Sequence, residues 1–355
     1  MANNPLLSDP ALRRRSMLKA AGLAGAGIMS SLAQAHAQRE TQTPGAAVPE
    51  RPDAAVWSAE YGAKKGDVKL NLWRKRAAAP KPGEPALPVL FLVHGSSNSA
   101  RSSYDLTVPG KGEYSFMNVF AGYGYDVWTM DHDGYGYSGS SGNSSDIASG
   151  VADLKAAIPL VLEQSGAGKI HMFGTSSGAI RAGAYAQAEP DRVDRLILAA
   201  FTYKGTGSAE IGRRAARLAE LRASNRRKRD AAMIRSIFTR DGHAAGYDPA
   251  VAEAIIAMEL TFGDEIPSGT YLDMAANLPL VDPTKVPSPV LMIRGEHDGN
   301  STNDDLLDFY RQLPNGDRQF VILPHTSHSA GYSKNRHLLW YAVRNFLAAP
   351  SAIVS

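Results

Sequence analysis

The chain has 355 residues, of which 44% are hydrophobic, with no cysteine and a formal net charge of +3. The lack of cysteine excludes a disulfide framework, a thiolate nucleophile and a cysteine-ligated metal site. Residues 1–37 hold four basic side chains and one acidic one, so the rest of the chain is close to neutral. A neutral chain has no excess positive charge to attract nucleic acid or anionic lipid, and neither is an expected partner.

The N-terminal segment, residues 1–37, resembles a twin-arginine export signal. Arg14 and Arg15 precede a mildly apolar stretch rich in alanine and glycine, and small side chains offer cleavage before His36 or Gln38. That stretch is too short and too rich in glycine to span a bilayer, so no stable membrane anchor is expected in the mature form. The sequence therefore predicts a periplasmic or secreted protein.

The rest of the chain alternates between strand-like and helix-like patterns. A flexible leader is expected at residues 38–56, and the stretches 57–64 and 68–76 predict an antiparallel hairpin. Continuous apolar runs, typical of strands buried on both faces of a sheet, occur at residues 88–93, 125–130, 170–173, 196–201, 290–293 and 320–323. Helical patterns lie between or after them, at residues 147–164, 179–189 and 338–347. This alternation predicts an α/β fold with a mostly parallel sheet covered by helices on both faces.

One region interrupts the alternation. Residues 202–285 have helical periodicity and no convincing strand, which predicts a helical cap or lid inserted into a core formed by residues 57–201 and 286–355. Within it, residues 211–235 carry nine Lys and Arg side chains. An apolar helical stripe crosses the same segment, at Ile211, Ala215, Leu218 and Leu221. The basic residues could form a wall that attracts an acidic substrate, but we favour a solvated helix face.

A G-x-S-x-G pattern at residues 174–178 follows one of the predicted strands and precedes a helix. A sharp strand-to-helix turn presents a serine hydroxyl to a base and to oxyanion donors, and it needs small flanking residues. Ser177 also lies in the turn. We favour Ser176 because it alone has glycine two positions away on each side.

Polar residues that could complete a nucleophilic site follow three other predicted strands. Glu296 and Asp298 follow the strand at 290–293, and His325 and His328 follow the strand at 320–323. His94-Gly95-Ser96-Ser97-Asn98 follows the strand at 88–93. Because the carboxyl ends of parallel strands meet at one edge of a sheet, we expect these groups to gather around the serine.

These motifs resemble the α/β-hydrolase fold superfamily, in particular its serine esterases and lipases, over residues 57–348. The resemblance is carried by His94-Gly95, the 131–138 loop (Asp131-His132-Asp133-Gly134-Tyr135-Gly136-Tyr137-Ser138), the 174–178 turn, Gly295-Glu296-His297-Asp298 and His328. It implies Ser176 as nucleophile, His328 as general base and acid, and Asp298 as the group that fixes the histidine tautomer. It also implies an oxyanion hole made by the backbone N–H groups of Ser177 and Ser96, with Ser97 as the less favoured second donor.

The resemblance also bears on the other polar residues that follow the strands. The family places its histidine several residues beyond the last strand, which favours His328 over His325. Glu296 lies nearer the strand end than Asp298 and is expected to face away. His94 is expected to brace its loop. His132 and His297 show no metal-ligand spacing, so neither a metal nor a cofactor is expected.

The expected activity is hydrolysis of a small-molecule carboxylic ester or lactone through an acyl-enzyme on Ser176. A carbon–carbon hydrolase acting on a β-diketone would use the same three residues and is the main alternative. A binding protein on a hydrolase scaffold is more remote, because such proteins usually lose a member of the triad. Tyr332 and the aromatic residues Tyr104, Tyr114 and Phe116 could line the pocket or serve packing, and the sequence leaves this open, as it does the oligomeric state.

Overall fold

The computed structural model describes residues 56–350, so the predicted export signal and nearly all of the predicted leader lie outside the described residues. An eight-stranded sheet runs through the molecule in the order β1-β2-β4-β3-β5-β6-β9-β10. The strands span Trp57–Lys65 (β1), Val68–Arg76 (β2), Val89–Val93 (β3), Asp126–Met130 (β4), Ile170–Thr175 (β5), Val193–Ala199 (β6), Val290–Gly295 (β9) and Arg318–Leu323 (β10). All neighbouring pairs from β4 to β10 are parallel, while β2 is antiparallel to both β1 and β4. The predicted hairpin and mostly parallel sheet are confirmed.

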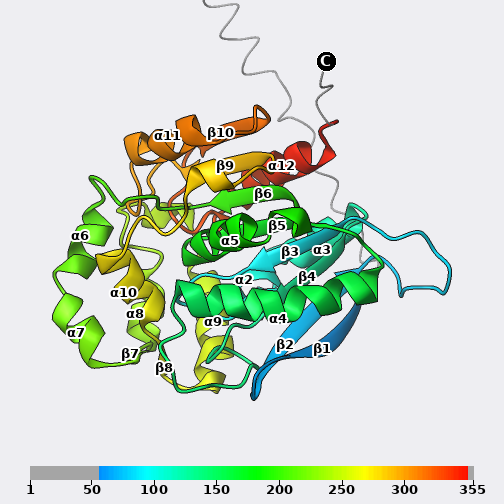
Figure 1. Ribbon diagram of the computed structural model, residues 1–355. Coiled ribbons are helices and arrows are strands. Elements are labelled where there is room, and N and C mark those ends of the chain that lie inside the picture. The colour runs from blue at the N-terminus through cyan, green and yellow to red at the C-terminus, as the bar shows by residue number, and fades with distance from the viewer. Residues whose placement is uncertain (1–55, 351–355) are drawn as a thin grey trace, which may run out of the picture. The chain divides into compact units, whose positions relative to one another are not determined.

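Helices cover both faces of this sheet (Figure 1). Helices α4 (Ile147–Ser165), α5 (Ser177–Ala188) and α11 (Asn303–Gln312) pack on one face. Helices α3 (Phe116–Gly122) and α12 (Arg336–Ala348) pack on the other, and the short α2 (Ala100–Tyr104) follows β3. Strands β3, β4 and β6 consist almost entirely of buried side chains, as continuous apolar runs require when both faces are covered.

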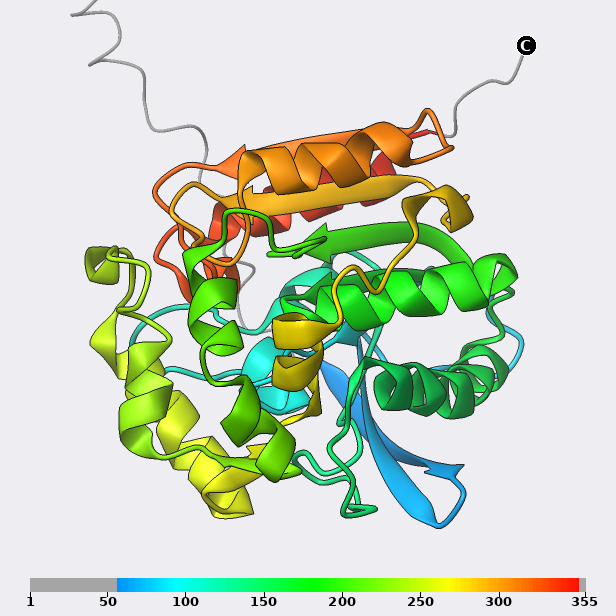
Figure 2. The same ribbon diagram turned by 60° about the vertical axis from the view of Figure 1, so that its left-hand side comes forward.

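The segment between β6 and β9 gathers beyond the carboxyl ends of the strands (Figures 1 and 2). Its helices are α6 (Ala209–Ala215), α7 (Leu218–Ala223), α8 (Ala231–Ser236), α9 (Pro249–Glu259) and α10 (Gly269–Ala276). The expectation that it contains no strand is wrong. β7 (Arg226–Lys228) pairs antiparallel with β8 (Glu265–Pro267), and these three-residue strands are too short to produce a periodic signal in the sequence.

An apolar cluster of its own anchors the insertion to the loop that follows α2. Side chains of α8 and α9, such as Ile234 and Val251, pack with Leu106, Val108 and Tyr114 from the loop that follows α2. None of the helices within residues 56–350 is both long and apolar enough to cross a membrane.

A buried ion pair ties β2 to β4 across their antiparallel register. Arg74 donates two hydrogen bonds to Asp126, at 2.9 and 2.6 Å, and both residues are 1% exposed. The Arg74 guanidinium also stacks on Trp128, its register neighbour, at 4.8 Å from the ring centroid. Two charges taken out of water depend on each other, so neither can be removed alone without leaving the other unpaired.

We expect Asp126→Ala to lower the free energy of unfolding by about 3–5 kcal/mol, because it leaves the Arg74 charge buried without its partner. Glu189→Ala breaks the exposed Lys155–Glu189 pair and should cost at most about 1 kcal/mol. Urea denaturation of both variants measures the difference. Equal losses would contradict this account of the β2–β4 contact.

Candidate active site

Ser176 lies in a tight turn between β5 and α5, as the sequence predicts. Its backbone adopts φ 57° and ψ −128°, a conformation that L-residues rarely take. The Ser176 N–H donates to the Ala199 carbonyl at 2.9 Å, which ties the turn to the end of neighbouring β6. The fold therefore holds the serine in a strained geometry that lifts its side chain off the end of the central strand.

The flanking glycines allow that turn to pack. A Cβ at Gly174 would overlap the backbone of Gly178 and Ala179, where α5 begins. A Cβ at Gly178 would overlap the carbonyl oxygens of Val93 and His94 at the end of β3. Both glycines are thus required by close approach of backbone to backbone.

Ser176, His328 and Asp298 form a continuous hydrogen-bonded chain. His328 Nε2 lies 2.9 Å from Ser176 Oγ, and His328 Nδ1 lies 2.9 Å from Asp298 Oδ1. The three residues come from the loops after β5, β10 and β9, which end at the same edge of the sheet. The structure therefore brings together the three side chains that the sequence singles out.

The Asp298 carboxylate is buried and is held charged by its neighbours. Burial opposes the charge, but three neighbours outweigh it and hold the pKa of Asp298 below its usual range. They are the His328 ring, the Asn300 backbone N–H, which donates a hydrogen bond at 2.8 Å, and the Arg240 guanidinium. A charged acceptor on Nδ1 keeps a proton on that nitrogen and leaves Nε2 free to accept the serine proton.

Two further residues that sequence reasoning missed hold His328. Asp241, from the insertion, accepts a hydrogen bond from the His328 backbone N–H at 3.0 Å. The Asn300 side-chain nitrogen lies 3.4 Å from His328 Nε2. Asn300 stands two residues beyond Asp298 and could have been noticed for that reason. Asp241 lies 87 positions from His328 and no local pattern marks it.

The loop after β3 passes directly over the serine. A Cβ at Gly95 would come within 3.3 Å of the Ser176 Cβ, so a larger residue there would press on Ser176. The Ser96 and Ser177 hydroxyls are buried and lie 2.5 Å apart. Ser177 is the first residue of α5, so its N–H has no partner within the helix and is available at the turn.

His94 braces this loop, as expected from the sequence. Its ring is buried, its Nε2 accepts the backbone N–H of His132 at 3.1 Å, and its Nδ1 lies 2.8 Å from the Gly95 carbonyl. Burial holds the pKa of His94 well below its usual value, so the ring is neutral and can accept that bond. His132 in turn contacts Asp153 at 3.0 Å.

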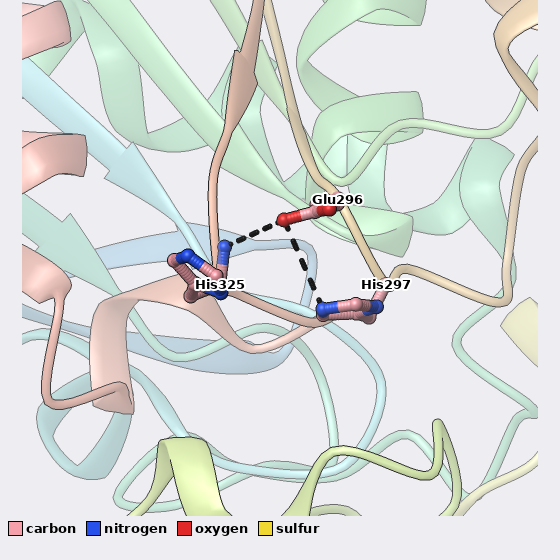
Figure 3. Close-up of side chains that lie close together, drawn as sticks. All are labelled: Glu296, His297 and His325. Atoms are coloured by element: carbon pink, nitrogen blue, oxygen red, sulfur yellow. Dashed lines mark hydrogen bonds and ion pairs between the residues drawn. The ribbon is translucent and has the colours of Figure 1, made fainter. Parts of the chain in front are cut away.

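The alternative residues Glu296 and His325 lie together in a separate cluster with His297 (Figure 3). The Glu296 carboxylate accepts the His325 backbone N–H at 2.8 Å and lies 3.8 Å from His297 Nε2. One ligand atom from each residue falls within 4.8 Å of the others, a donor set that could hold a divalent cation. The spacing of these residues in the sequence predicts no such cluster, because two separate loops bring them together.

A cavity opens onto Ser176 and His328. Four aromatic residues line it: Tyr104, Tyr114, Phe116 and Tyr332. They also pack within the neighbouring apolar clusters, so each lines the pocket and serves packing at the same time. The Tyr332 hydroxyl donates to the Ser102 carbonyl at 3.2 Å.

The insertion supplies Arg214, Arg240 and Tyr271 to the same cavity. The favoured interpretation of the basic segment as a solvated face is therefore wrong for part of it. Arg213 and Arg217 are 58% exposed, but Arg214 is 5% exposed. The predicted stripe includes Ala215, which is exposed, and the segment folds as two short helices rather than one.

A mostly parallel sheet with a serine at a strand-to-helix turn, hydrogen-bonded to a histidine and an aspartate from later strand ends, defines an α/β-hydrolase. The chain belongs to the serine aminopeptidase S33 family, which it matches over residues 106–332. Ser176, Asp298 and His328 all fall within the matched region. A search of curated protein sequences found no significant match.

Solved structures share the fold at low sequence identity. A 2-hydroxy-6-oxo-6-phenylhexa-2,4-dienoate hydrolase from Rhodococcus sp. strain RHA1 is 18% identical, with a TM-score of 0.60 over 82% of this chain and 100% of that one. A thermophilic esterase from Thermogutta terrifontis is 20% identical, with a TM-score of 0.58 over 82% and 98%. An enol-lactonase from Burkholderia xenovorans LB400 is 16% identical, with a TM-score of 0.53 over 81% and 100%.

We expect Gly178→Ala to destabilise the protein by about 1–3 kcal/mol or more, since the added methyl overlaps two backbone carbonyls. Gly168→Ala is the control, because a Cβ there meets no atom within 4 Å. Thermal unfolding of both purified variants measures the effect. A Gly178→Ala variant as stable as the control would show that the turn can relax, contrary to the packing described here.

Proposed function

We propose that the protein hydrolyses a carboxylic ester or lactone through an acyl-enzyme on Ser176. The observation that carries this proposal is the hydrogen-bonded chain from Ser176 Oγ through His328 to Asp298. A serine hydroxyl becomes nucleophilic when a neutral imidazole can take its proton and a carboxylate fixes the imidazole tautomer. The strained turn at Ser176 supports the same assignment, because strain of this kind is retained at functional sites.

In the proposed cycle, His328 Nε2 takes the hydroxyl proton as Ser176 Oγ bonds to the substrate carbonyl carbon. The N–H groups of Ser177 and Ser96 stabilise the negative charge that develops on the carbonyl oxygen. The ester C–O bond then breaks, and His328 gives its proton to the leaving alkoxide. Water attacks the acyl-enzyme by the same sequence, which releases the acid and restores Ser176. Loss of either oxyanion donor should cost on the order of 100-fold in rate.

Carbon–carbon cleavage is the second candidate, because it would use the same three side chains. The Rhodococcus enzyme, whose fold this chain shares, is a hydrolase of 2-hydroxy-6-oxo-6-phenylhexa-2,4-dienoate. The family is that of the serine aminopeptidases, so the amide bond is a further candidate. Ester hydrolysis stays the first proposal, since it makes the smallest demand on the site: an activated serine, an oxyanion hole and water.

We expect a fluorophosphonate probe to label Ser176, with the modified peptide identified by mass spectrometry. Ser176→Ala should abolish the label, because the hydroxyl that is activated by His328 is gone. Ser177→Ala is the matched control and should leave position 176 labelled, since the Ser177 hydroxyl is directed to Ser96. Labelling at another residue would refute the assignment of the nucleophile.

We expect p-nitrophenyl esters to be turned over faster than a β-diketone or an aminoacyl p-nitroanilide when all are assayed on the same preparation. Asp298→Asn should lower kcat by on the order of 10⁴-fold, because it favours the wrong histidine tautomer. Preferential cleavage of the β-diketone would establish the carbon–carbon alternative. Preferential cleavage of the anilide would establish a peptidase.

A further inference from the structure

The wall of the cavity that the insertion supplies is cationic. Arg214 and Arg240 are the charged residues that line the cavity beside His328, and no Asp or Glu of residues 56–350 lines it. The Arg214 residue is 5% exposed and the Arg240 side chain is 17% exposed. Both guanidinium groups are therefore largely removed from bulk water, where an unpaired charge is costly.

The Arg214 and Arg240 guanidinium groups share a single carboxylate partner among the described residues. Among residues 56–350, only the Glu210 carboxylate lies within 4.0 Å of these guanidinium groups. It lies 3.3 Å from Arg214 and 4.0 Å from Arg240. That carboxylate is already bonded to the exposed Arg213 at 2.7 Å. The Arg240 Nε atom is buried without a hydrogen-bond partner among residues 56–350. Asp241 and Asp298 also attract Arg240, but Asp241 holds the His328 N–H and Asp298 holds the His328 ring.

A third arginine, Arg227, adds positive charge close to the loop that follows β3. Arg227 lies over the Tyr271 ring at 3.8 Å, and Arg214 lies over it at 4.3 Å. Arg227 also donates to the Ser96 carbonyl at 2.7 Å. Burial acts to raise the pKa of Tyr271, yet the charges of Arg227, Arg214 and Arg240 lower it to about 6. Near neutral pH the Tyr271 phenolate therefore supplies one negative charge against three guanidinium groups, and the positive charge that remains favours a further anion.

From this geometry we infer that the substrate carries a carboxylate, bound by Arg214 and Arg240, while its scissile carbonyl lies at Ser176. The inference rests on the proposed hydrolysis and specifies its substrate class: acidic esters or lactones such as half-esters of dicarboxylic acids. A guanidinium fork matches a carboxylate in shape and charge, and the Arg240 guanidinium lines the cavity without a side-chain hydrogen bond to any residue of 56–350. A substrate with a free ammonium group would meet like charge on this wall.

Three probes of equal acyl length test the inference: mono-4-nitrophenyl adipate, its neutral methyl ester, and 4-nitrophenyl 6-aminohexanoate. Nitrophenolate release measures kcat/KM for each. We expect the acidic probe to exceed the neutral one by roughly 10–100-fold, the value of one charged hydrogen-bonded contact. The ammonium probe should be the slowest. An acidic probe no better than the neutral one would overturn the inference and leave the proposed ester hydrolysis standing.

Arg240→Gln should lower the ratio of acidic to neutral kcat/KM towards one, and Arg240→Lys should restore part of it. Arg217→Gln is the matched control. It removes the same charge from the exposed face of the insertion and should leave both kcat/KM values unchanged. A ratio that survives Arg240→Gln in a variant with unchanged thermal stability would overturn the inference.

Calorimetry separates this inference from the proposed hydrolysis if none of the probes is turned over. Adipate is titrated into the Ser176→Ala protein and into the Ser176→Ala/Arg240→Gln protein. Binding to the first and not to the second supports a carboxylate site even though ester hydrolysis has failed. No binding to the first protein overturns the carboxylate site as well.

Discussion

The close approach of three backbone segments around Ser176 is the constraint on which the site depends. The end of β5, the start of α5 and the end of β3 meet there with no room for a side chain at Gly174 or Gly178. Packing of the helix against the sheet compensates for the unfavourable backbone conformation of Ser176. Because β5 is a central strand, with β3 on one side and β6 on the other, loops that follow strands on both sides can reach the serine.

The insertion takes part in the site as well as covering it. Asp241 holds the backbone of His328, and Arg240 contributes to the charge balance around Asp298. The same segment places Arg214 and Tyr271 in the cavity wall, so it both holds His328 and contributes to the charge of the cavity. A change in the insertion can therefore alter both the geometry of His328 and the charge of the cavity wall.

The errors of the sequence analysis fall mainly in this insertion, and they share one cause. Apolar periodicity shows which face of a helix is buried, but it does not show whether an arginine on that helix faces solvent or a cavity. Arg214 lies one helical turn after the buried Ile211, on the inner face of α6, whereas Arg213 lies on the exposed face. The strands β7 and β8 escaped notice because three residues are too few for a period-two pattern. The export signal stays a prediction, since it lies outside the described residues.

The sequence by itself determined the sheet, the serine turn, and the order in which Ser176, Asp298 and His328 follow strand ends along the chain. These features are local: apolar runs mark buried strands, glycines mark the turn, and polar residues follow strand ends. The family resemblance favoured His328 over His325 and Asp298 over Glu296, but only the tertiary structure shows the favoured pair in a hydrogen-bonded chain with Ser176. It alone brought Asp241 and the arginines to the site. Those contacts depend on how separate loops converge at one sheet edge, and the spacing of residues along a chain does not encode the direction in which a loop side chain points.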